Sequence, residues 1–483
     1  MTSRIDARKR WVALIVLCLG ELMIVLDTTI VNVALPSIRE ALLFTETSLV
    51  WVVNAYMLTY GGFLLLGGRL GDLYGQRRLF LAGIALFTLA SVVCGVSNSQ
   101  GLLIAARAVQ GLGGAVVSSI ALSLMMNIFT EPGERAKAMG IFGFVCAGGG
   151  SIGVLAGGLL TDALSWHWIF LVNLPIGAAV YWLSAILLQE SRALAAARLD
   201  VGGAVTVTAS LMLAVYAIVN GNEAGWTSTQ TLGLLGASAV LLALFLAIET
   251  WVRDPLMPLR FFRVRSLATA NVVGILWSAA MFAWFFVSAL YMQLVLAYSP
   301  MQVGLAFLPS NLIMAAFSLG ISAKMVMRFG TRLPLAAGLL LTAAGLALFA
   351  LSPVDGGFAL HVLPGMTLLG IGCGMAMNPV LLVAMSDVEQ SESGLASGVV
   401  NTAFMMGGAL GLAVLASLAA ARTESLLAAG AASAAALNGG YHAAFAVGAV
   451  FAAAAALLCA VLLRAGRHSP ALQGGEAADP AKP

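Results

Sequence analysis

Charged residues are scarce in this chain, and their scarcity excludes an ordinary water-soluble protein. Only 9% of the 483 residues are Asp, Glu, Lys or Arg, whereas 61% are hydrophobic. The mean hydropathy is +0.99. Soluble globular domains carry roughly 25% charged residues, so we expect most of this chain to lie in a lipid bilayer.

Cysteine and histidine are also few, which argues against a metal site or a disulfide framework. All five cysteines lie in apolar stretches, and the four histidines are scattered. The sequence lacks a phosphate-binding loop of the form GxxxxGK[ST], and no polar connection exceeds about twenty residues. We therefore predict no metal, no cofactor, no enzymatic activity and no nucleic-acid partner.

Long apolar runs dominate the chain instead. A bilayer core about 30 Å thick needs roughly 20 apolar residues per helix, and the sequence supplies fourteen such runs. The predicted spans cover approximately residues 11–35, 49–67, 79–97, 101–123, 137–160, 167–188, 201–219, 230–250, 267–296, 302–322, 333–351, 360–383, 395–419 and 441–463. This pattern predicts an all-α polytopic membrane protein.

Lys and Arg residues fall into alternate connections, which sets the orientation of the chain in the membrane. With the N-terminus in the cytoplasm, only Arg39 and Arg422 face outside, and Arg107 lies within a span. We therefore expect an even number of crossings with both termini cytoplasmic. The net charge of +3 reflects this topology.

An internal repeat divides the chain. "GGRLGDLYGQRRLF" (67–80) has a counterpart 255 residues later in "SAKMVMRFGTRLPL" (322–335), with Gly-x-Arg at the same spacing. Duplicated halves are typical of transporters that bind substrate between them. We predict a six-helix bundle at 1–188, a linker with two inserted transmembrane helices at 189–265, a second six-helix bundle at 266–465, and a disordered cytoplasmic tail at 466–483.

The first copy of this repeat resembles the cytoplasmic loop motif of the major facilitator superfamily. Four residues match the motif: Gly68, Asp72, Gly75 and Arg78. Leu73 and Gln76 stand where basic residues are usual. The resemblance implies a latch that holds two halves together on the cytoplasmic side, and the alternative is that Asp72 is an ordinary solvated turn charge.

Further segments resemble the fourteen-span drug:proton antiporters of that superfamily. "GGGSIGVLAGGLL" resembles their fifth-span motif through Gly149, Gly153, Gly157 and Gly158, with Val154 where Pro is usual. Similar marks are "LDTTIVNVALP", "LLIAARAVQGLGGA", "SWHWIFLVNLPIG" with His167 where Arg is usual, "PLMPLRFF" and "SGLASGVVNTAFMMGGALG". Small residues let helices approach and slide, although tight packing alone leaves the same trace.

Two carboxylates lie inside the first predicted span. A charge at the bilayer centre costs about 2.5 to 3.5 kcal/mol on insertion scales, so Glu21 and Asp27 should face a cavity or exchange a proton. The two positions lie about 120° apart on a helix and need not share a face. The resemblance favours Asp27 as the proton-coupling group, and either acid could instead only bond a neighbouring helix.

Arg107, inside the fourth span, needs a carboxylate or several carbonyls as partners. The resemblance implies a part in proton transfer, and Asp27 is our candidate for its partner. The alternative is a fixed structural ion pair. Candidate residues of the substrate cavity are Asn32, Gln110, Trp277, Met281 and Trp284. The last three belong to a helical stripe suited to flat cations, although packing or lipid contact explains such a stripe equally.

These features predict an antiporter of the bacterial inner membrane that works as a monomer and exports drugs or other amphipathic small molecules, cations among them, in exchange for protons. Two alternatives stay open. One is an exporter or importer of a single metabolite, such as a natural product or an amino acid, on the same scaffold. The other is a transport-inactive membrane sensor or enzyme, against which stands the lack of a signalling domain and of a nucleophile, His and acid grouping.

Overall fold

The structure, a computed structural model, describes residues 7–129, 131–188, 200–252, 255–388 and 393–463. The predicted tail, the side chain of Asp72 and several side chains between 132 and 151 lie outside the described residues. Every regular element that the structure describes is a helix. This agrees with the sequence prediction, because a helix satisfies its own backbone hydrogen bonds within a bilayer.

Following the sequence prediction, we call residues 1–188 the first half, 189–265 the insert and 266–465 the second half. The described residues of the first half and the insert contain nine α-helices. The first half comprises α1 (Ala7–Leu42), α2 (Glu46–Tyr74), α3 (Gln76–Gly95), α4 (Gln100–Ile128), α5 (Pro132–Ala163), α6 (Trp168–Leu171) and α7 (Asn173–Leu187), and the insert comprises α8 (Val201–Ala224) and α9 (Thr229–Trp251).

Seven α-helices and four short 3-10 or π segments follow in the described residues. These elements are η1 (Leu259–Arg263) at the end of the insert and then, in the second half, α10 (Arg265–Leu290), η2 (Tyr291–Val295), α11 (Pro300–Ala316), η3 (Phe317–Ile321), α12 (Ser322–Phe329), α13 (Arg332–Phe349), η4 (Phe358–Val362), α14 (Leu363–Met385), α15 (Ser393–Ala428) and α16 (Ser433–Leu462).

Twelve of the described helices are long and apolar enough to cross a membrane. Two shorter apolar stretches, Ile152–Ala163 and Pro300–Ala316, fall in the predicted fifth and tenth spans. α5 as a whole has 32 residues, which is roughly 48 Å at 1.5 Å per residue. The number of fourteen spans therefore stays a prediction, whereas the helical membrane architecture is confirmed.

Local sequence explains several helix ends. Thr45 accepts a hydrogen bond from the backbone of Ser48 in a capping box at the start of α2, and Ser299 does the same for α11. Gly75 and Gly330, which correspond in the repeat, both have positive φ, 97° and 73°. Because glycine lacks a Cβ, it ends α2 and α12 without strain at these two positions.

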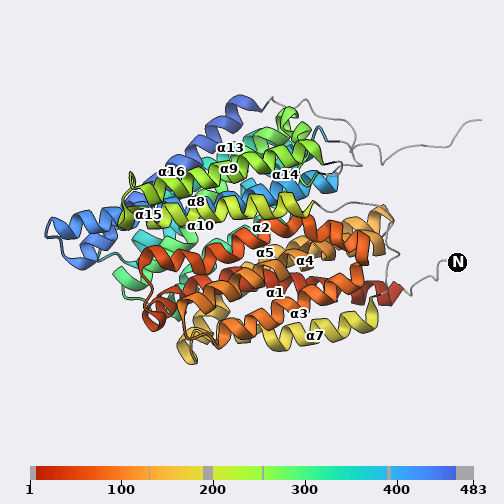
Figure 1. Cartoon of the computed structure of the whole chain (residues 1–483), viewed down its shortest axis with the longest axis horizontal. Coiled ribbons are helices and arrows are strands. Elements are labelled where there is room, and N and C mark those ends of the chain that lie inside the picture. Colours follow the sequence, from red (N-terminus) through yellow and green to blue (C-terminus); the bar gives the residue numbers. More distant parts are fainter. Residues whose placement is uncertain (1–6, 130, 189–199, 253–254, 389–392, 464–483) are drawn as a thin grey trace, which may run out of the picture.

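The two halves lie against each other along their lengths. Figure 1 shows α1, α3, α4 and α7 on one side and α13, α14, α15 and α16 on the other. α2 packs on α15, α5 packs on α11, and α1 touches α10. We use the word seam for each of the two lines of contact, α2 with α15 and α5 with α11.

The insert lies beside the first of these seams. α8 packs against both α2 and α15. The Nδ2 group of Asn222 in α8 donates to the backbone carbonyl of Ser417 in α15 at 2.8 Å. A Cβ on Gly62 of α2 would lie 1.9 Å from Oγ1 of Thr208 in α8, so these helices are in close contact.

The halves are also joined at the end of α1 that lies away from the N-terminus. Gln293 donates from Nε2 to the backbone carbonyl of Val33 at 2.8 Å. Asn54 donates to the backbone carbonyl of Ala409 at 3.0 Å. The protein is therefore closed between the halves at this end.

Candidate functional site

Asp27 lies in the middle of α1 and is fully buried, with 0% of its surface exposed. Arg107 of α4 is 1% exposed and donates from Nη1 to Oδ2 of Asp27. The structure thus gives Arg107 the partner that the sequence suggested. A buried guanidinium keeps its charge, so it requires such a counter-charge.

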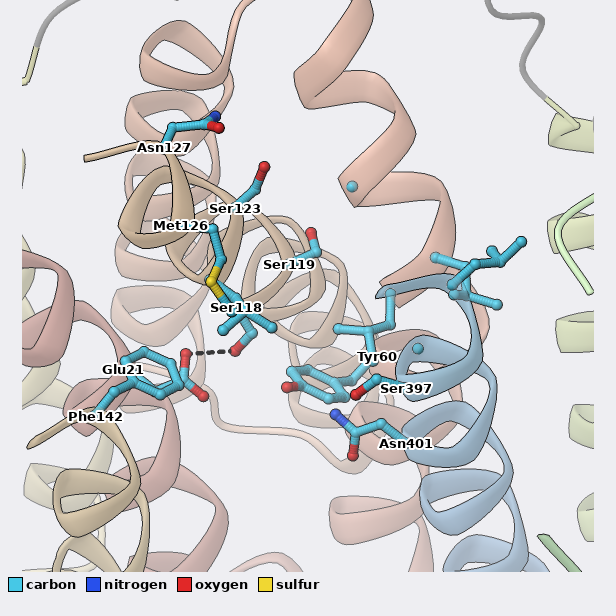
Figure 2. Close-up of a pocket in the computed structure, with 16 residues that line it drawn as sticks. Glu21, Tyr60, Ser118, Ser119, Ser123, Met126, Asn127, Phe142, Ser397 and Asn401 are labelled. Atoms are coloured by element: carbon cyan, nitrogen blue, oxygen red, sulfur yellow. Dashed lines mark hydrogen bonds between the residues drawn. The ribbon is translucent and has the colours of Figure 1, made fainter. Parts of the chain in front are cut away.

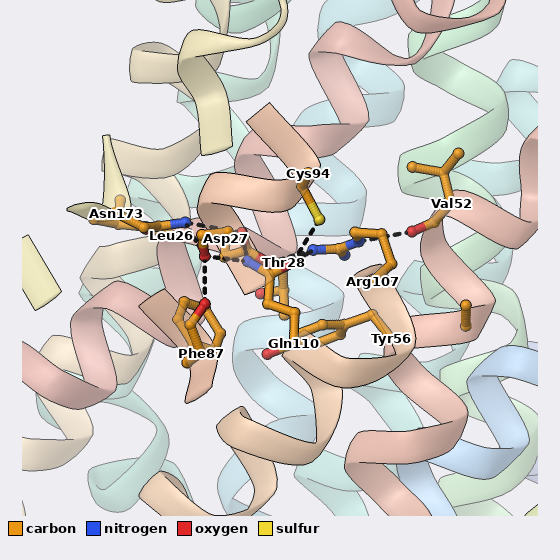
Figure 3. A network of polar contacts seen from close by, with 12 residues as sticks. Leu26, Asp27, Thr28, Val52, Tyr56, Phe87, Cys94, Arg107, Gln110 and Asn173 are labelled. Carbon is orange, nitrogen blue, oxygen red and sulfur yellow. Dashed lines mark hydrogen bonds and ion pairs between the residues drawn. The ribbon is translucent and has the colours of Figure 1, made fainter. Parts of the chain in front are cut away.

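Three further side chains complete a polar network around this pair (Figure 3). Gln110 of α4 and Asn173 of α7 both donate to Oδ1 of Asp27, at 2.7 Å and 3.0 Å. Gln110 also accepts from Nη1 of Arg107 at 2.7 Å and donates to Oγ of Ser91 in α3 at 2.7 Å. Four helices, α1, α3, α4 and α7, therefore contribute to one buried network.

The remaining contacts of Arg107 fix its position. Its Nε donates to the backbone carbonyl of Val52 in α2 at 2.8 Å. Its guanidinium lies 4.4 Å from the ring centre of Tyr56 and 5.7 Å from that of Phe170, within cation–π range. These contacts anchor the arginine independently of Asp27.

The network gives Asp27 a well-defined chemistry. Both carboxylate oxygens accept hydrogen bonds, so the ionised form is fully satisfied. A proton on this carboxyl would remove the counter-charge of Arg107 and would replace at least one of the donors. Protonation therefore changes contacts on several helices at once.

Glu21, six residues earlier in α1, occupies a different environment. It lines a cavity of about 510 Å³ between the halves, and its Oε2 accepts a hydrogen bond from Ser118 of α4 at 2.8 Å (Figure 2). The cavity lining comprises Glu21, Tyr60, Leu64, Leu65, Gly68, Ser118, Ser119, Leu122, Ser123, Met126, Asn127, Phe142, Leu395, Ser397, Gly398 and Asn401. Asp27 and Glu21 are thus separated into a buried network and a cavity wall.

The cavity lies toward the cytoplasmic end predicted from the charge distribution. It extends to Gly68 near the end of α2, Asn127 near the end of α4 and Leu395 near the start of α15. The opposite end is closed by the contacts of Gln293 and Asn54 described above. The cavity and these contacts therefore lie toward opposite ends of the protein.

The predicted gate motif surrounds the turn between α2 and α3. Gly68 lines the cavity, Gly75 forms the turn, and Arg78 is exposed. The side chain of Asp72 lies outside the described residues. Gln76, where a basic residue is usual, donates to Ser123 at 2.6 Å and accepts from Asn127 at 2.9 Å, both in α4.

The glycines of α5 lie against two helices. A Cβ on Gly149, Gly153 or Gly157 would lie within 3.0 Å of atoms in α1. A Cβ on Gly158 would lie 2.7 Å from the backbone oxygen of Pro300 at the start of α11. The fifth-span motif thus allows close contact of α5 with α1 and across the second seam.

The other predicted cavity residues lie outside the described lining. Asn32 donates to backbone carbonyls of its own helix, and Gln110 belongs to the network of Asp27. Trp277 is buried against Phe404, with ring centres 5.5 Å apart. Trp284 is buried against Phe285 and Phe307, and Met281 is partly buried beside the same hydrophobic cores.

Several polar residues of the site were not predicted from the sequence. Ser91 and Asn173 contact the buried network, and Ser397 and Asn401 line the cavity. Asn173 and Asn401 do lie within two segments that resemble the antiporter family, "SWHWIFLVNLPIG" and "SGLASGVVNTAFMMGGALG". That resemblance was the only sequence feature that pointed to these two residues.

His167 lies in the connection between α5 and α6. Its ring stacks on that of Trp166, with ring centres 3.8 Å apart. Burial lowers the pKa of His167, because a partly buried site disfavours the charged imidazolium. Among the described residues, no group of three or more His, Cys, Asp or Glu side chains is arranged to hold a metal ion.

Comparison with known proteins decides the family. The profile of the Major Facilitator Superfamily matches residues 17–412. The chain belongs to this superfamily. It is therefore an MFS transporter, and together with its apolar helices this membership makes it a multi-pass protein of the bacterial inner membrane.

Its relatives in the superfamily include resistance and export proteins. The puromycin resistance protein of Streptomyces alboniger is 39% identical over 94% of this chain and 90% of its own length. The cephamycin export protein of Amycolatopsis lactamdurans is 37% identical over 95% and 93%. The lincomycin resistance protein of Streptomyces lincolnensis is 35% identical over 85% of each chain.

Solved structures share the same MFS fold. An auto-inhibited peptide transporter of the POT family has a TM-score of 0.68, with 17% identity over 95% of this chain and 98% of that one. A bacterial homologue of the lysosomal transporter Spinster, in an inward-facing conformation, has a TM-score of 0.67 at 15% identity, over 95% and 98%. At these identities the likeness concerns the fold alone.

Proposed function

We propose that this protein is a proton-coupled antiporter that exports drugs or other amphipathic, cationic small molecules by alternating access. The named activities of its relatives support export, because they confer resistance to puromycin and lincomycin or export cephamycin. The cavity between the two halves supports a small-molecule substrate.

The observation that carries this proposal is the buried pair of Asp27 and Arg107. A carboxylate with 0% exposure, held by donors from other helices, can couple its protonation to helix movement. Inward movement of a proton releases about 2.3 kcal/mol per 100 mV of membrane potential. Asp27 is the proton carrier in this proposal, Arg107 is its ion-pair partner, and Glu21 faces the substrate.

The conformational part of the proposal assigns two motifs. Gly68, Asp72, Gly75 and Arg78 form the cytoplasmic gate, which closes when the halves rock. The glycines of α5 supply the smooth surface on which α1 and α11 move. Gln76 adds to this gate, since its bonds to Ser123 and Asn127 join the turn to the cavity end of α4.

The topology in this proposal has fourteen spans and two cytoplasmic termini. α5 and the α11–α12 pair are then the fifth and tenth crossings. A cysteine placed at position 223, in a cysteine-free variant, should react with an impermeant maleimide from outside whole cells, and one at position 260 only after the cells are opened. The reverse pattern contradicts this topology.

The transport proposal is tested with purified protein in proteoliposomes that contain the fluorescent cation ethidium. An imposed proton gradient should drive ethidium against its concentration gradient, and a protonophore should abolish this movement. Asp27→Asn should lose gradient-driven transport but retain ethidium exchange, because exchange needs the cavity and no proton release. Glu21→Gln should retain coupling, and normal coupled transport by Asp27→Asn contradicts the assignment.

A second function is favoured by one relative. The cephamycin export protein is named for one natural product, which supports an exporter of a single metabolite on the same scaffold. A panel of chemically unrelated substrates in the same proteoliposomes separates the two, because a single-metabolite exporter responds to one chemical class.

A further inference from the structure

The cavity has polar side chains on both halves of the protein, set among apolar ones such as Leu64, Leu122 and Phe142. α4 supplies Ser118, Ser119 and Ser123 from the first half, and α15 supplies Ser397 and Asn401 from the second. Figure 2 shows Ser397 and Asn401 together beside Tyr60, across the cavity from Glu21. A substrate between the halves is thus offered hydrogen bonds from two directions.

The two α15 side chains are free to bind a ligand. Asn401 is exposed to the cavity, and Ser397 is partly exposed. Among the described residues, neither has a hydrogen-bond partner. By contrast, Ser118 is bonded to Glu21, and Ser123 accepts a hydrogen bond from Gln76. Asn401 therefore presents both a donor and an acceptor that only water or substrate satisfies.

The charge of the cavity restricts the substrate further. Glu21 is the only acidic residue of the described lining, and that lining contains no Lys, Arg or His. An anionic group would find no compensating cation in this lining, whereas a neutral or cationic group needs none. The aromatic stripe suggested for flat cations is buried elsewhere, as Trp277 and Trp284 have 0% exposure.

We infer that this cavity selects amphipathic solutes that carry hydroxyl groups and are neutral or cationic, such as glycosides, amino sugars and nucleosides with apolar substituents, and that Ser397 and Asn401 of α15 are specificity-determining residues. The inference rests on the proposed function, because it takes this cavity as the substrate site. In this inference, Ser397 and Asn401 of the second half distinguish one amphipathic molecule from another.

Hydrogen bonding gives such a wall its selectivity. An apolar molecule in the cavity would displace water from Asn401 and leave its amide unpaired, which is unfavourable. A hydroxyl-bearing molecule restores those bonds. Sites built to bond a hydroxyl reject analogues that lack it much more strongly than apolar pockets reject an extra group.

The test uses two fluorescent neutral probes of similar size, N-dansyl-glucosamine and N-dansyl-cyclohexylamine. They differ in the hydroxyl groups and ring oxygen of the sugar. Binding is measured by fluorescence titration of the purified full chain in detergent at fixed pH, without a proton gradient. Wild-type protein should bind the glucosamine probe saturably.

The variants then locate the recognition. Asn401→Leu should weaken the glucosamine probe about fivefold, the effect of one neutral hydrogen bond, and should leave the cyclohexylamine probe unchanged or tighter. Asn271→Leu is the matched control, because Asn271 is a membrane-helix asparagine outside the cavity lining that bonds its own helix. It should affect neither probe, and monodispersity in size-exclusion chromatography verifies the folding of each variant.

Two results overturn the inference: no saturable binding of the glucosamine probe to wild-type protein, or equal changes of both probes in Asn401→Leu. Failure of the proposed function is recognised separately. Selective binding without gradient-driven flux contradicts proton-coupled export and leaves the substrate class standing. Gradient-driven flux of ethidium without binding of the glucosamine probe supports proton-coupled export and contradicts the inferred substrate class.

Discussion

Arg77 and Arg332, which lie 255 positions apart, make the same contact in the two halves of the protein. Arg77 near the start of α3 donates to the backbone carbonyl of Ala185 in α7 at 2.5 Å. Arg332 at the start of α13 donates to the backbone carbonyl of Ala460 in α16. The repeat detected in the sequence is therefore also a repeat of side-chain contacts that tie the last long helix of each half to its neighbour.

Removal of either arginine should destabilise the protein to a similar extent. Each variant, Arg77→Ala or Arg332→Ala, loses a charge-assisted hydrogen bond, which contributes about 1.5 to 3 kcal/mol. The apparent melting temperature of the purified protein in detergent measures this loss. Arg422→Ala, at an exposed position, is the control and should leave the melting temperature unchanged. A loss in only one half would show that the two contacts are not equivalent.

The pair of Asp27 and Arg107 should show strong energetic coupling. Asp27→Asn or Arg107→Gln alone leaves one buried partner uncompensated, which costs about 3 to 5 kcal/mol. The double variant should cost much less than the sum of the two, because no unpaired charge remains. Unfolding in detergent measures all three variants. Glu21→Gln combined with Arg107→Gln should be additive, and additivity of Asp27→Asn with Arg107→Gln would contradict the pairing.

Two glycines of α5 should respond differently to a methyl group. In Gly157→Ala the new Cβ would lie 2.6 Å from the backbone oxygen of Ile30 in α1, so the helices must separate at a cost of about 1 to 3 kcal/mol. In Gly150→Ala the nearest atom, of Thr29, is 3.8 Å away, and alanine favours the helix. Thermal stability and transport should fall only in Gly157→Ala, and equal losses would refute a position-specific contact.

Glu249→Gln should stabilise the insert. Asp200 and Glu249 are buried, and Oδ2 of Asp200 and Oε1 of Glu249 lack hydrogen-bond donors. Both atoms would lie within 2.9 Å of a Cβ on Gly203, so they are close together. A glutamine amide can donate to Asp200 and still accept from the backbone of Met257, a gain of about 1 kcal/mol. The melting temperature of Glu249→Gln should rise. The exposed control Glu223→Gln should leave the melting temperature unchanged. A lower melting temperature in Glu249→Gln would disprove this account.

The gate motif yields a functional prediction. Asp72→Asn should weaken the closed cytoplasmic gate and reduce efflux several-fold, because a charge that favours one of two states by about 0.3 to 1 kcal/mol shifts their populations. Expression and melting temperature should stay near normal, since a single charge near the end of α2 contributes little to folding. Efflux from proteoliposomes provides the measurement, with Asp162→Asn as an exposed control. Unchanged efflux in Asp72→Asn would remove Asp72 from the gate.

Composition and apolar run length were sufficient to predict the helical membrane fold, because lipid leaves a chain few other choices. The pairing of Arg107 was also accessible, since a buried arginine needs an acid and Asp27 was a nearby candidate. The repeat anticipated Gly75 and Gly330, whose positive φ angles end corresponding helices. In each case the residue type itself imposes a physical requirement: apolar runs need lipid, a buried arginine needs an acid, and a helix end with positive φ favours glycine.

The faces of the helices could not be predicted in the same way. A membrane helix is apolar on every side, so periodicity does not show whether Trp277 points to the cavity or to the core. Gln110 illustrates the same difficulty, because its amide serves Asp27 and Ser91 and not the described cavity wall. Single polar residues such as Asn173 and Asn401 acquire their roles only from helices distant in sequence.

The position of the insert bears on how acyl chains can reach the protein. α8 contacts both helices of the α2–α15 seam, so a lipid tail could reach that seam from this side only by displacing α8. Among the described elements, only α1 and η3 contact both α5 and α11, and both belong to the halves themselves. A hydrophobic compound dissolved in the bilayer would therefore meet an asymmetric protein, in which an inserted helix covers the α2–α15 seam and no described helix of the insert covers the α5–α11 seam.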